Sequence, residues 1–137
     1  MLVIERMTRT PITIAGEATV EEALSILAEQ KQRHLPVLDA DENLIGIVSE
    51  KDLLRARCEE AVEKVMTREV VTVTEYTALE EAARIMADHT ISSLPVMRDG
   101  RLVGIITETD LFHIFLELLG GREEGVRLTM LVPEERG

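Results

Sequence analysis

Apolar positions along the chain follow the same series of patterns twice. Two short β-branched runs, PITI at 11–14 and VVTV at 70–73, predict strands. Apolar residues at positions i, i+3, i+4 and i+7 from Val20, and again from Leu79, predict amphipathic helices. After each predicted helix come two strand-like runs separated by a polar turn, and then a second helix. Each half of the chain therefore predicts the order strand, helix, strand, strand, helix.

The two halves are copies of one unit. VEEALSILAEQKQRHLPV at 20–37 matches LEEAARIMADHTISSLPV at 79–96, and LIGIVSEKDLL at 44–54 matches LVGIITETDLF at 102–112. The offset falls from 59 to 58 residues between DADEN and RDGR, so one residue is lost in a turn, where changes of length are tolerated. Neither unit is large enough to bury a sufficient core alone, so one compact body is expected. The expected division is residues 1–60, residues 61–120 and a C-terminal tail at 121–137.

Local signals refine the expected elements. Thr19 with Glu22, and Thr77 with Glu80, have the spacing of a capping box, which predicts the start of a helix at each place. The proline of each LPV run has no N–H to donate to a strand ladder. These two runs are therefore expected at edge or irregular positions of the sheets.

The nonapeptide GIVSEKDLL is repeated as GIITETDLF. In each copy a hydroxyl residue precedes an aspartate by three positions, Ser49 with Asp52 and Thr107 with Asp110. This spacing fits a helix capping box. The glycine three residues before each hydroxyl allows close approach of a ligand or of another backbone, and a helix N-terminus favours phosphate or ribose oxygens. Capping and ligand binding are both open here, since one geometry supplies both.

Composition and charge narrow the functional classes. The formal net charge of −11 repels polyanions and removes the counterion release that drives most nucleic-acid binding, so no nucleic-acid partner is expected. No apolar run approaches the roughly 20 residues that cross a bilayer, so a soluble, cytoplasmic protein without membrane contact is expected. Aromatic residues are only 2% of the chain, which predicts an aliphatic core. The single cysteine, Cys58, cannot form an internal disulfide.

Three motifs in order, each present twice, resemble the tandem CBS (cystathionine-β-synthase-type) domain pair, also called a Bateman module. The resemblance covers about residues 3–119. The residues that carry it are Met7-Thr8 and Met66-Thr67, Leu35-Pro36-Val37 and Leu94-Pro95-Val96, and the two Gly-x-x-Ser/Thr-x-x-Asp motifs. It implies an α/β (α+β) fold in which two β-α-β-β-α repeats pack sheet to sheet about a pseudo-twofold axis.

The resemblance also implies two clefts for adenosine-containing ligands. Asp52 and Asp110 are then expected to hold the ribose hydroxyls, because an ionised carboxylate accepts charge-assisted hydrogen bonds from two adjacent hydroxyls. Ser49 and Thr107 are expected to contact ribose or phosphate. The base pockets are expected to use Thr10, Pro11, Ile12 and His34 in the first unit and Glu69, Val70, Val71 and Ser93 in the second.

The two expected clefts differ in charge. The first unit offers Arg33, His34 and Lys51, where the second has Ser92, Ser93 and Thr109. A phosphorylated ligand is therefore expected to prefer the first, basic cleft. Glu69 stands where the first unit has Thr10, and its carboxylate argues against phosphate in the second cleft. The alternative for each of these side chains is an ordinary solvated surface position.

Other chemistry has no support in the sequence. The three histidines, His34, His89 and His113, are far apart, with no cysteine or carboxylate at metal-ligand spacing, so no metal site is expected. No Ser, Cys or Lys has a recognisable base beside it, so the chain is not expected to be an enzyme or to require a cofactor. The resemblance implies instead a regulatory ligand, either AMP, ADP, ATP, S-adenosylmethionine or NAD.

The C-terminal part suggests two further features. The segment LFHIFLELLGG at 111–121 is almost entirely apolar, and the family commonly pairs such helices between modules, so a homodimer is expected. Beyond it, VRLTMLV alternates like a strand, and VPEERG resembles the opening of the ACT domain that follows a CBS pair in acetoin-utilisation-B-type proteins. The chain is then a piece of a longer protein, or the tail is a terminal strand or flexible end.

Three functions compete at this point. The first is a regulatory module that senses an adenosine ligand and acts on an enzyme or transporter that the sequence leaves open. The second is a structural or dimerisation module whose clefts are empty and whose motifs are only helix caps. A nucleotide hydrolase ranks last.

Overall fold

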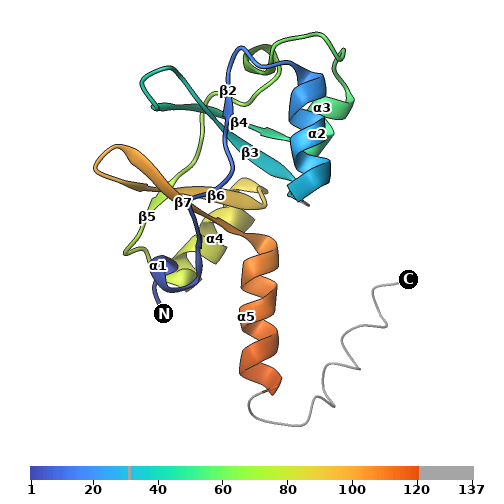
Figure 1. Cartoon of the computed structure of the whole chain (residues 1–137). Helices are drawn as coiled ribbons and strands as arrows, with labels where there is room; N and C mark the ends of the chain where they lie inside the picture. The colour runs from blue at the N-terminus through green and yellow to red at the C-terminus, as the bar shows by residue number, and fades with distance from the viewer. Residues whose placement is uncertain (31, 121–137) are drawn as a thin grey trace.

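The computed structural model describes residues 1–30 and 32–120 as two similar units, each built from a small sheet and its helices (Figure 1). The mixed α/β class with two small sheets is confirmed. The elements are α1 (Val3–Arg6), β1 (Thr8–Arg9), β2 (Ile14–Ala15), α2 (Val20–Gln30), β3 (His34–Leu38), β4 (Leu44–Ser49), α3 (Glu50–Leu54), the 3₁₀ turn η1 (Val62–Lys64), β5 (Val73–Thr74), α4 (Leu79–His89), β6 (Ser93–Arg98), β7 (Arg101–Thr107) and α5 (Glu108–Gly120).

The first strand of each unit is shorter than expected. The predictions of strands at 11–14 and 70–73 were wrong in extent, because β2 begins only at Ile14 and β5 only at Val73. Each of these strands pairs in parallel with the following strand over two residues. β-branched side chains favour strands only where a neighbouring strand supplies partners, and residues 11–13 and 70–72 lie outside both named sheets.

The strand order is β2-β3-β4 in one sheet and β1-β7-β6-β5 in the other. The expectation of an edge position for the LPV strands was wrong, since β3 lies between β2 and β4, but the expected irregularity is present after Val37, where the register shifts. Pro36 is tolerated in this central strand because β2 pairs only with Val37 and Leu38 and stops short of it. The residue of β4 that pairs with Pro36 is Ile47. The N–H and C=O of Ile47 both bond Thr67, so Ile47 does not need a hydrogen bond from the proline.

Each unit is completed by a segment that precedes the other unit in the chain. The N-terminal residues lie against the second unit, where β1 pairs with β7 and Val3 N donates to the Thr77 carbonyl over 2.8 Å (Figure 1). In the same way, Val62 N donates to the Ala18 carbonyl over 2.8 Å. Val3 and Met7 accordingly belong to the core of the second unit. The chain therefore crosses between the units before each repeat begins, and the two crossing pieces, residues 1–9 and 61–67, are called the exchanged segments.

One of the two predicted capping boxes forms. Thr19 N donates to Glu22 over 2.8 Å, and Glu22 N donates to Thr19 Oγ1 over 3.1 Å. The box predicted for Thr77 and Glu80 was wrong, because Ala78 is the residue that precedes α4 and Thr77 Oγ1 accepts from Thr74 N instead. The amide of Leu79, the first residue of α4, donates to the Met1 carbonyl over 2.9 Å. The exchanged N-terminal segment thus satisfies an amide that no capping side chain reaches.

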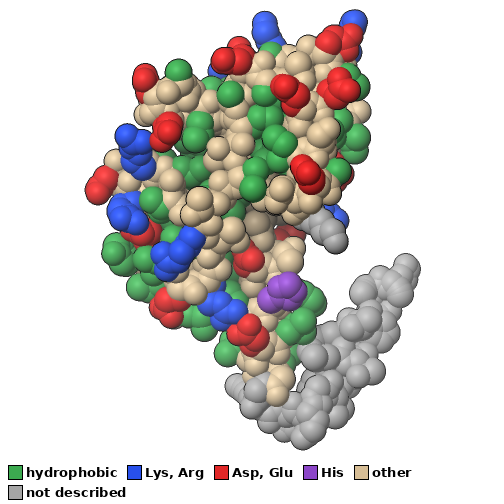
Figure 2. All heavy atoms as spheres, in the orientation of Figure 1, with side chains coloured by type: hydrophobic (Ala, Val, Ile, Leu, Met, Phe, Trp, Pro, Cys, Tyr) green, Lys and Arg blue, Asp and Glu red, His purple; other side chains and the backbone are tan. Residues whose placement is uncertain are grey.

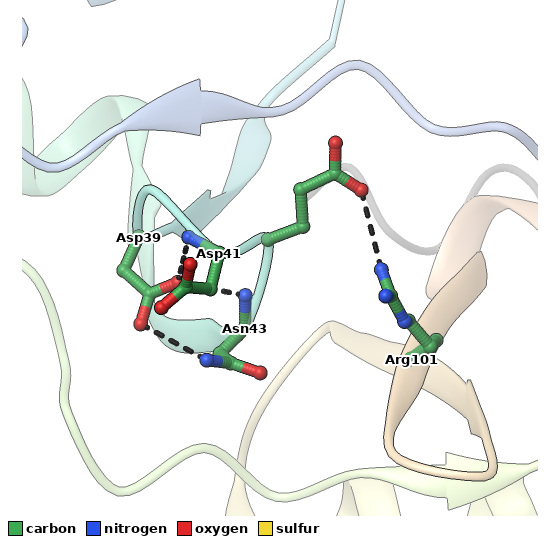
Figure 3. A network of polar contacts seen from close by, with 5 residues as sticks. Asp39, Asp41, Asn43 and Arg101 are labelled. Atoms are coloured by element: carbon green, nitrogen blue, oxygen red, sulfur yellow. Dashed lines mark hydrogen bonds and ion pairs between the residues drawn. The ribbon is translucent and has the colours of Figure 1, made fainter.

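The polar turn between β3 and β4 is held by the Asp39 carboxylate. It accepts hydrogen bonds from the backbone amides of Asp41 and Asn43, each over 2.9 Å, and from the Asn43 side chain over 3.2 Å (Figure 3). The hydrogen bonds from Asn43 lower the pKa of Asp39 below its ordinary value. Glu42 of this turn forms an ion pair of 3.3 Å with Arg101 in the hairpin of the second unit. The two hairpin turns therefore meet.

The one-residue difference in length between the repeats lies in the hairpin turns, β3 to β4 in the first unit and β6 to β7 in the second. In the first unit Leu38 pairs with Leu44, whereas in the second Met97 pairs with Leu102. The shorter turn places Asp99 and Gly100 at φ 52° and 79°, the left-handed region that a tight hairpin turn requires. Gly100 adopts this region without strain, since it has no Cβ.

Helix α5 extends away from the two sheets (Figure 1). Ile114 is its buried side chain, whereas Phe112, Phe115 and Leu118 are exposed. Near its end, Glu117 accepts two hydrogen bonds from the Arg6 guanidinium of α1, over 3.0 and 2.7 Å. This pair raises the pKa of Arg6 and lowers that of Glu117. The expected homodimer stays a prediction, and the expected ACT-like start at 121–137 lies outside the described residues.

Candidate functional site

A cavity of about 990 Å³ lies between the two units. Its volume falls at the upper end of the range typical of small-molecule sites. The residues expected from the sequence that line it are Arg33, His34, Ser49, Lys51, Asp52, Glu69, Val70, Val71, Ser92 and Ser93. The lining of this cavity does not include Thr10, Pro11, Ile12, Thr107 or Asp110.

The expected grouping of these residues by unit was wrong. The sequence interpretation placed Thr10, Pro11 and Ile12 with the first motif, but the structure places Val70 and Val71 beside Ser49 and Asp52. The cause is the crossing of the chain. Thr67 bonds Ile47 of β4 through both its N–H and its C=O, and the chain then runs past the first motif to reach β5 in the other sheet. The residues before β5 therefore line the cleft of the first motif.

Both repeated motifs form capping boxes. Asp52 N donates to Ser49 Oγ over 3.1 Å, and Ser49 N donates to Asp52 Oδ2 over 3.0 Å. In the second motif the corresponding distances between Thr107 and Asp110 are 3.2 and 2.9 Å. Within the described ranges, the hydrogen bonds of the Asp52 side chain use Oδ2 alone. Among the described residues, the capping role therefore leaves Asp52 Oδ1 without a hydrogen bond.

The repeated glycines make room for backbone. A Cβ placed on Gly46 would lie 2.9 Å from the carbonyl oxygen of Thr67, and one on Gly104 would lie 2.9 Å from that of Thr8. Both carbonyls belong to the segments exchanged between the units. Of the two uses that the sequence left open, the structure supports the approach of another backbone.

His34 connects the two units beside the cavity. Its Nε2 lies 3.1 Å from Ser92 Oγ, which comes from the opposite unit. Burial lowers the pKa of His34 below its ordinary value of 6.5; Asp52 raises it in part, Arg33 lowers it further, and Glu108 raises it. Burial is the largest of these causes, so the fold favours the neutral imidazole.

This burial predicts a pH dependence of stability. The folded-state pKa lies below 6.5, so as the pH falls the unfolded chain takes up the proton first. The stabilisation that neutral His34 provides is complete above about pH 6.5 and is lost as the pH falls through the folded-state pKa. Wild type and His34→Gln are compared by urea unfolding between pH 8 and pH 5. The free energy of unfolding is expected to fall further for wild type than for His34→Gln as the pH is lowered. Parallel pH profiles for the two proteins would contradict this assignment.

The charges around the cavity correct a second expectation. Glu69 was assigned to the mouth of a different pocket from the basic residues, but it lines the same cavity as Arg33 and Lys51. The sequence interpretation also missed Glu50 and Glu108, the first residues of α3 and α5, which line this cavity too. Their signal was present, since both repeated motifs carry glutamate directly after the hydroxyl residue. On the face in Figure 2, acidic and basic side chains are interspersed over both units.

Residues 1–30 and 32–120 contain no group of three or more His, Cys, Asp or Glu side chains placed to hold a metal ion. None of the helices in these ranges is long and apolar enough to cross a membrane.

Comparison with known proteins places the chain in a family. The model of the CBS domain matches twice, at residues 3–59 and 62–117. The chain belongs to the CBS domain family, as a tandem pair. An AcuB-type protein from Vibrio cholerae has a similar structure, with a TM-score of 0.81 and 37% identity, covering 90% of this chain and 96% of that one.

Two similar structures hold adenosine compounds. The CBS domain pair of protein MJ0100, in complex with 5′-methylthioadenosine and S-adenosyl-L-methionine, has a TM-score of 0.81 and 32% identity, covering 90% of this chain and 98% of that one. CBSX2 in complex with AMP has a TM-score of 0.77 and 30% identity, covering 85% of this chain and 97% of that one.

Relatives in sequence include much longer proteins. The L-aspartate semialdehyde sulfurtransferase of Methanocaldococcus jannaschii is 33% identical over 117 residues, which are 83% of this chain but 23% of that protein. A CBS domain-containing protein of Dictyostelium discoideum is 31% identical over 136 residues, covering 87% of this chain and 94% of that one. The chain thus spans about a quarter of the first of these relatives and nearly all of the second.

Proposed function

We propose that this CBS pair is a regulatory module that binds an adenosine-containing ligand in the cavity between its units. The observation that carries the proposal is the position of Asp52, which caps α3 through Oδ2 and also lines the 990 Å³ cavity. An ionised carboxylate suits the two adjacent hydroxyls of ribose. Val70, Val71 and Met86 offer aliphatic surface on the same cavity for the base.

Regulation follows from the placement of the cavity. Its lining comes from both units, with Ser49 and Asp52 on one side and Val70, Ser92 and Ser93 from the other. A ligand that contacts both sides stabilises the relative arrangement of the units in which those contacts are made. The ligands of the similar CBS pairs, S-adenosyl-L-methionine, 5′-methylthioadenosine and AMP, share the adenosine group that this arrangement suits.

A second candidate function is a ligand-free dimerisation scaffold. The exposed apolar side chains of α5, Phe112, Phe115 and Leu118, favour it, because large apolar side chains gathered on one helix commonly mark an interaction surface. The two candidates differ in one respect that can be measured. A scaffold does not need the Asp52 carboxylate for anything beyond its helix cap.

The test is isothermal titration of AMP, ADP, ATP, NAD, 5′-methylthioadenosine and S-adenosylmethionine into protein stripped of copurified ligand. We expect at least one of them to bind wild type, and Asp52→Asn to weaken that binding about tenfold or more, since hydrogen bonds to charged groups contribute about 1.5–3 kcal/mol. Asparagine retains an oxygen for the cap of α3. The matched control is Asp110→Asn, which makes the same change at the equivalent cap outside this cavity.

Three outcomes would count against the proposal. If no adenosine compound binds wild type, the scaffold is the better description. Equal ligand affinity in wild type and Asp52→Asn would show that the Asp52 carboxylate does not contact the ligand. Loss of ligand binding in Asp110→Asn alone would show that the ligand binds at the second motif, Thr107 and Asp110.

A further inference from the structure

We propose that the cavity selects among adenosine ligands by charge: it accepts a 5′ substituent that is uncharged or cationic, discriminates against polyphosphates, and uses Glu69 and Glu108 for this selection. The inference rests on the proposed function, because it concerns the ligand of the same cavity.

The first support is the set of charges that surrounds the cavity. Four carboxylates line it, from Glu50, Asp52, Glu69 and Glu108, against two permanent cations, from Arg33 and Lys51. The ion pairs found within the described residues involve none of these six side chains. The acidic side chains are therefore not neutralised by partners among those residues, and a bound anion meets an excess of negative charge.

The second support is the location of the charges relative to the junction of the units. His34, which bonds Ser92 across that junction, is within electrostatic range of Asp52, Arg33 and Glu108. Glu108 begins α5 in the second unit, and Asp52 lies in α3 of the first. Carboxylates thus approach the cavity from both units. A ligand held at Asp52 lies within reach of the negative charge of the second unit as well as that of the first.

The third support is the difference between the repeats at Glu69. The first unit has Thr10 at the equivalent position, a neutral residue, so the repeat itself shows that the position does not require an acid. Glu69 is exposed at the cavity, as are Glu50 and Glu108. Glu69 therefore adds a negative charge to this cleft that the equivalent position of the other repeat lacks.

The expected size of the effect is moderate. Exposed charges are screened by solvent and salt, so one carboxylate is expected to change the affinity for a nearby phosphate by about three- to tenfold. A triphosphate brings several negative charges near the same carboxylates, so their unfavourable contributions to the binding free energy add up. The whole chain, at a net charge of −11, adds a long-range repulsion in the same direction.

The experiment compares four compounds that share adenosine and differ in 5′ charge: S-adenosylmethionine, a cationic sulfonium; uncharged 5′-methylthioadenosine; AMP; and ATP without divalent cations. Titrations at low ionic strength are expected to show 5′-methylthioadenosine or S-adenosylmethionine binding wild type about tenfold or more tightly than ATP. The variant Glu69→Gln/Glu108→Gln is expected to tighten ATP about tenfold and to leave 5′-methylthioadenosine within about threefold.

The matched control is Glu17→Gln/Glu80→Gln, which makes the same change in net charge at two exposed acids outside the lining of the cavity. It is expected to leave the ratio of ATP to 5′-methylthioadenosine affinity unchanged. Glu69→Thr, which installs the residue of the first repeat, is expected to act in the same direction as Glu69→Gln. Added salt is expected to narrow the gap between the two ligands in wild type.

The outcomes separate this inference from the proposed function. If ATP binds wild type as tightly as 5′-methylthioadenosine, the selection is wrong while the adenosine site stands. The selection is also wrong if the cavity double variant and the control double variant change the affinity ratio equally. If none of the four compounds binds, the proposed function fails and the selection fails with it.

Discussion

Replacement of Gly46 by alanine is expected to destabilise the folded chain by about 2–3 kcal/mol, towards the upper end of what overpacking costs. The new Cβ would lie 2.9 Å from the Thr67 carbonyl oxygen and 2.8 Å from Met66 Cγ. Met66 is a flexible side chain, but Thr67 is backbone that bonds Ile47 through both its N–H and its C=O. The strand or the exchanged segment therefore has to move, and either movement weakens the junction of the units.

The measurement is urea unfolding of Gly46→Ala, with Gly104→Ala as the equivalent change in the second unit. The control is Gly120→Ala, at the end of α5, where a Cβ meets nothing within 4 Å and alanine is the better helix former. A fully stable Gly46→Ala that loses ligand affinity would reverse the assignment, because the glycine would then serve the ligand and not the exchanged backbone.

Local structure was predicted well from the sequence because its signals are local. The periods of the apolar positions, the hydroxyl and aspartate spacing and the polar turns each act within a few residues. Helices α2 and α4 accordingly begin at Val20 and Leu79, and both repeated motifs cap the helices that follow them. The repeat also located the turn that differs in length between the two units.

Three of the errors share one physical cause, which is that the chain crosses between units. Thr77 was expected to cap α4, but the carbonyl of Met1, from the far end of the exchanged segment, accepts the hydrogen bond from Leu79 N. Val70 was assigned to the pocket of its own unit, but its segment leaves β4 of the other unit at Thr67. Glu69 was separated from Arg33 for the same reason. Repeats in a sequence show which residues are equivalent, but not which copy of a segment completes which unit.

Replacement of Leu53 by alanine is expected to destabilise the fold by about 2–5 kcal/mol. Leu53 is fully buried in the core of the first unit, together with Val62 and Met66 of the exchanged segment. Helix α3 has only five residues, too few to be stable without tertiary packing. The cavity left by the truncated side chain therefore loosens the helix that carries Asp52 as well as the contact between α3 and the exchanged segment.

The neighbouring residue provides a matched control. Leu54 is 67% exposed and lines the cavity between the units. Leu54→Ala removes the same atoms from the next position of the same helix, and it is expected to change stability by about 0.5 kcal/mol or less. Thermal and urea unfolding of the two variants test the difference, and titration with the best-binding adenosine compound reports on the cavity. Equal destabilisation by both substitutions would contradict the burial of Leu53 beneath α3. A large loss of stability and of ligand affinity for Leu53→Ala alone would show that the first Gly-x-x-Ser-x-x-Asp motif is held in place by the core beneath it, since Leu53 itself does not line the cavity.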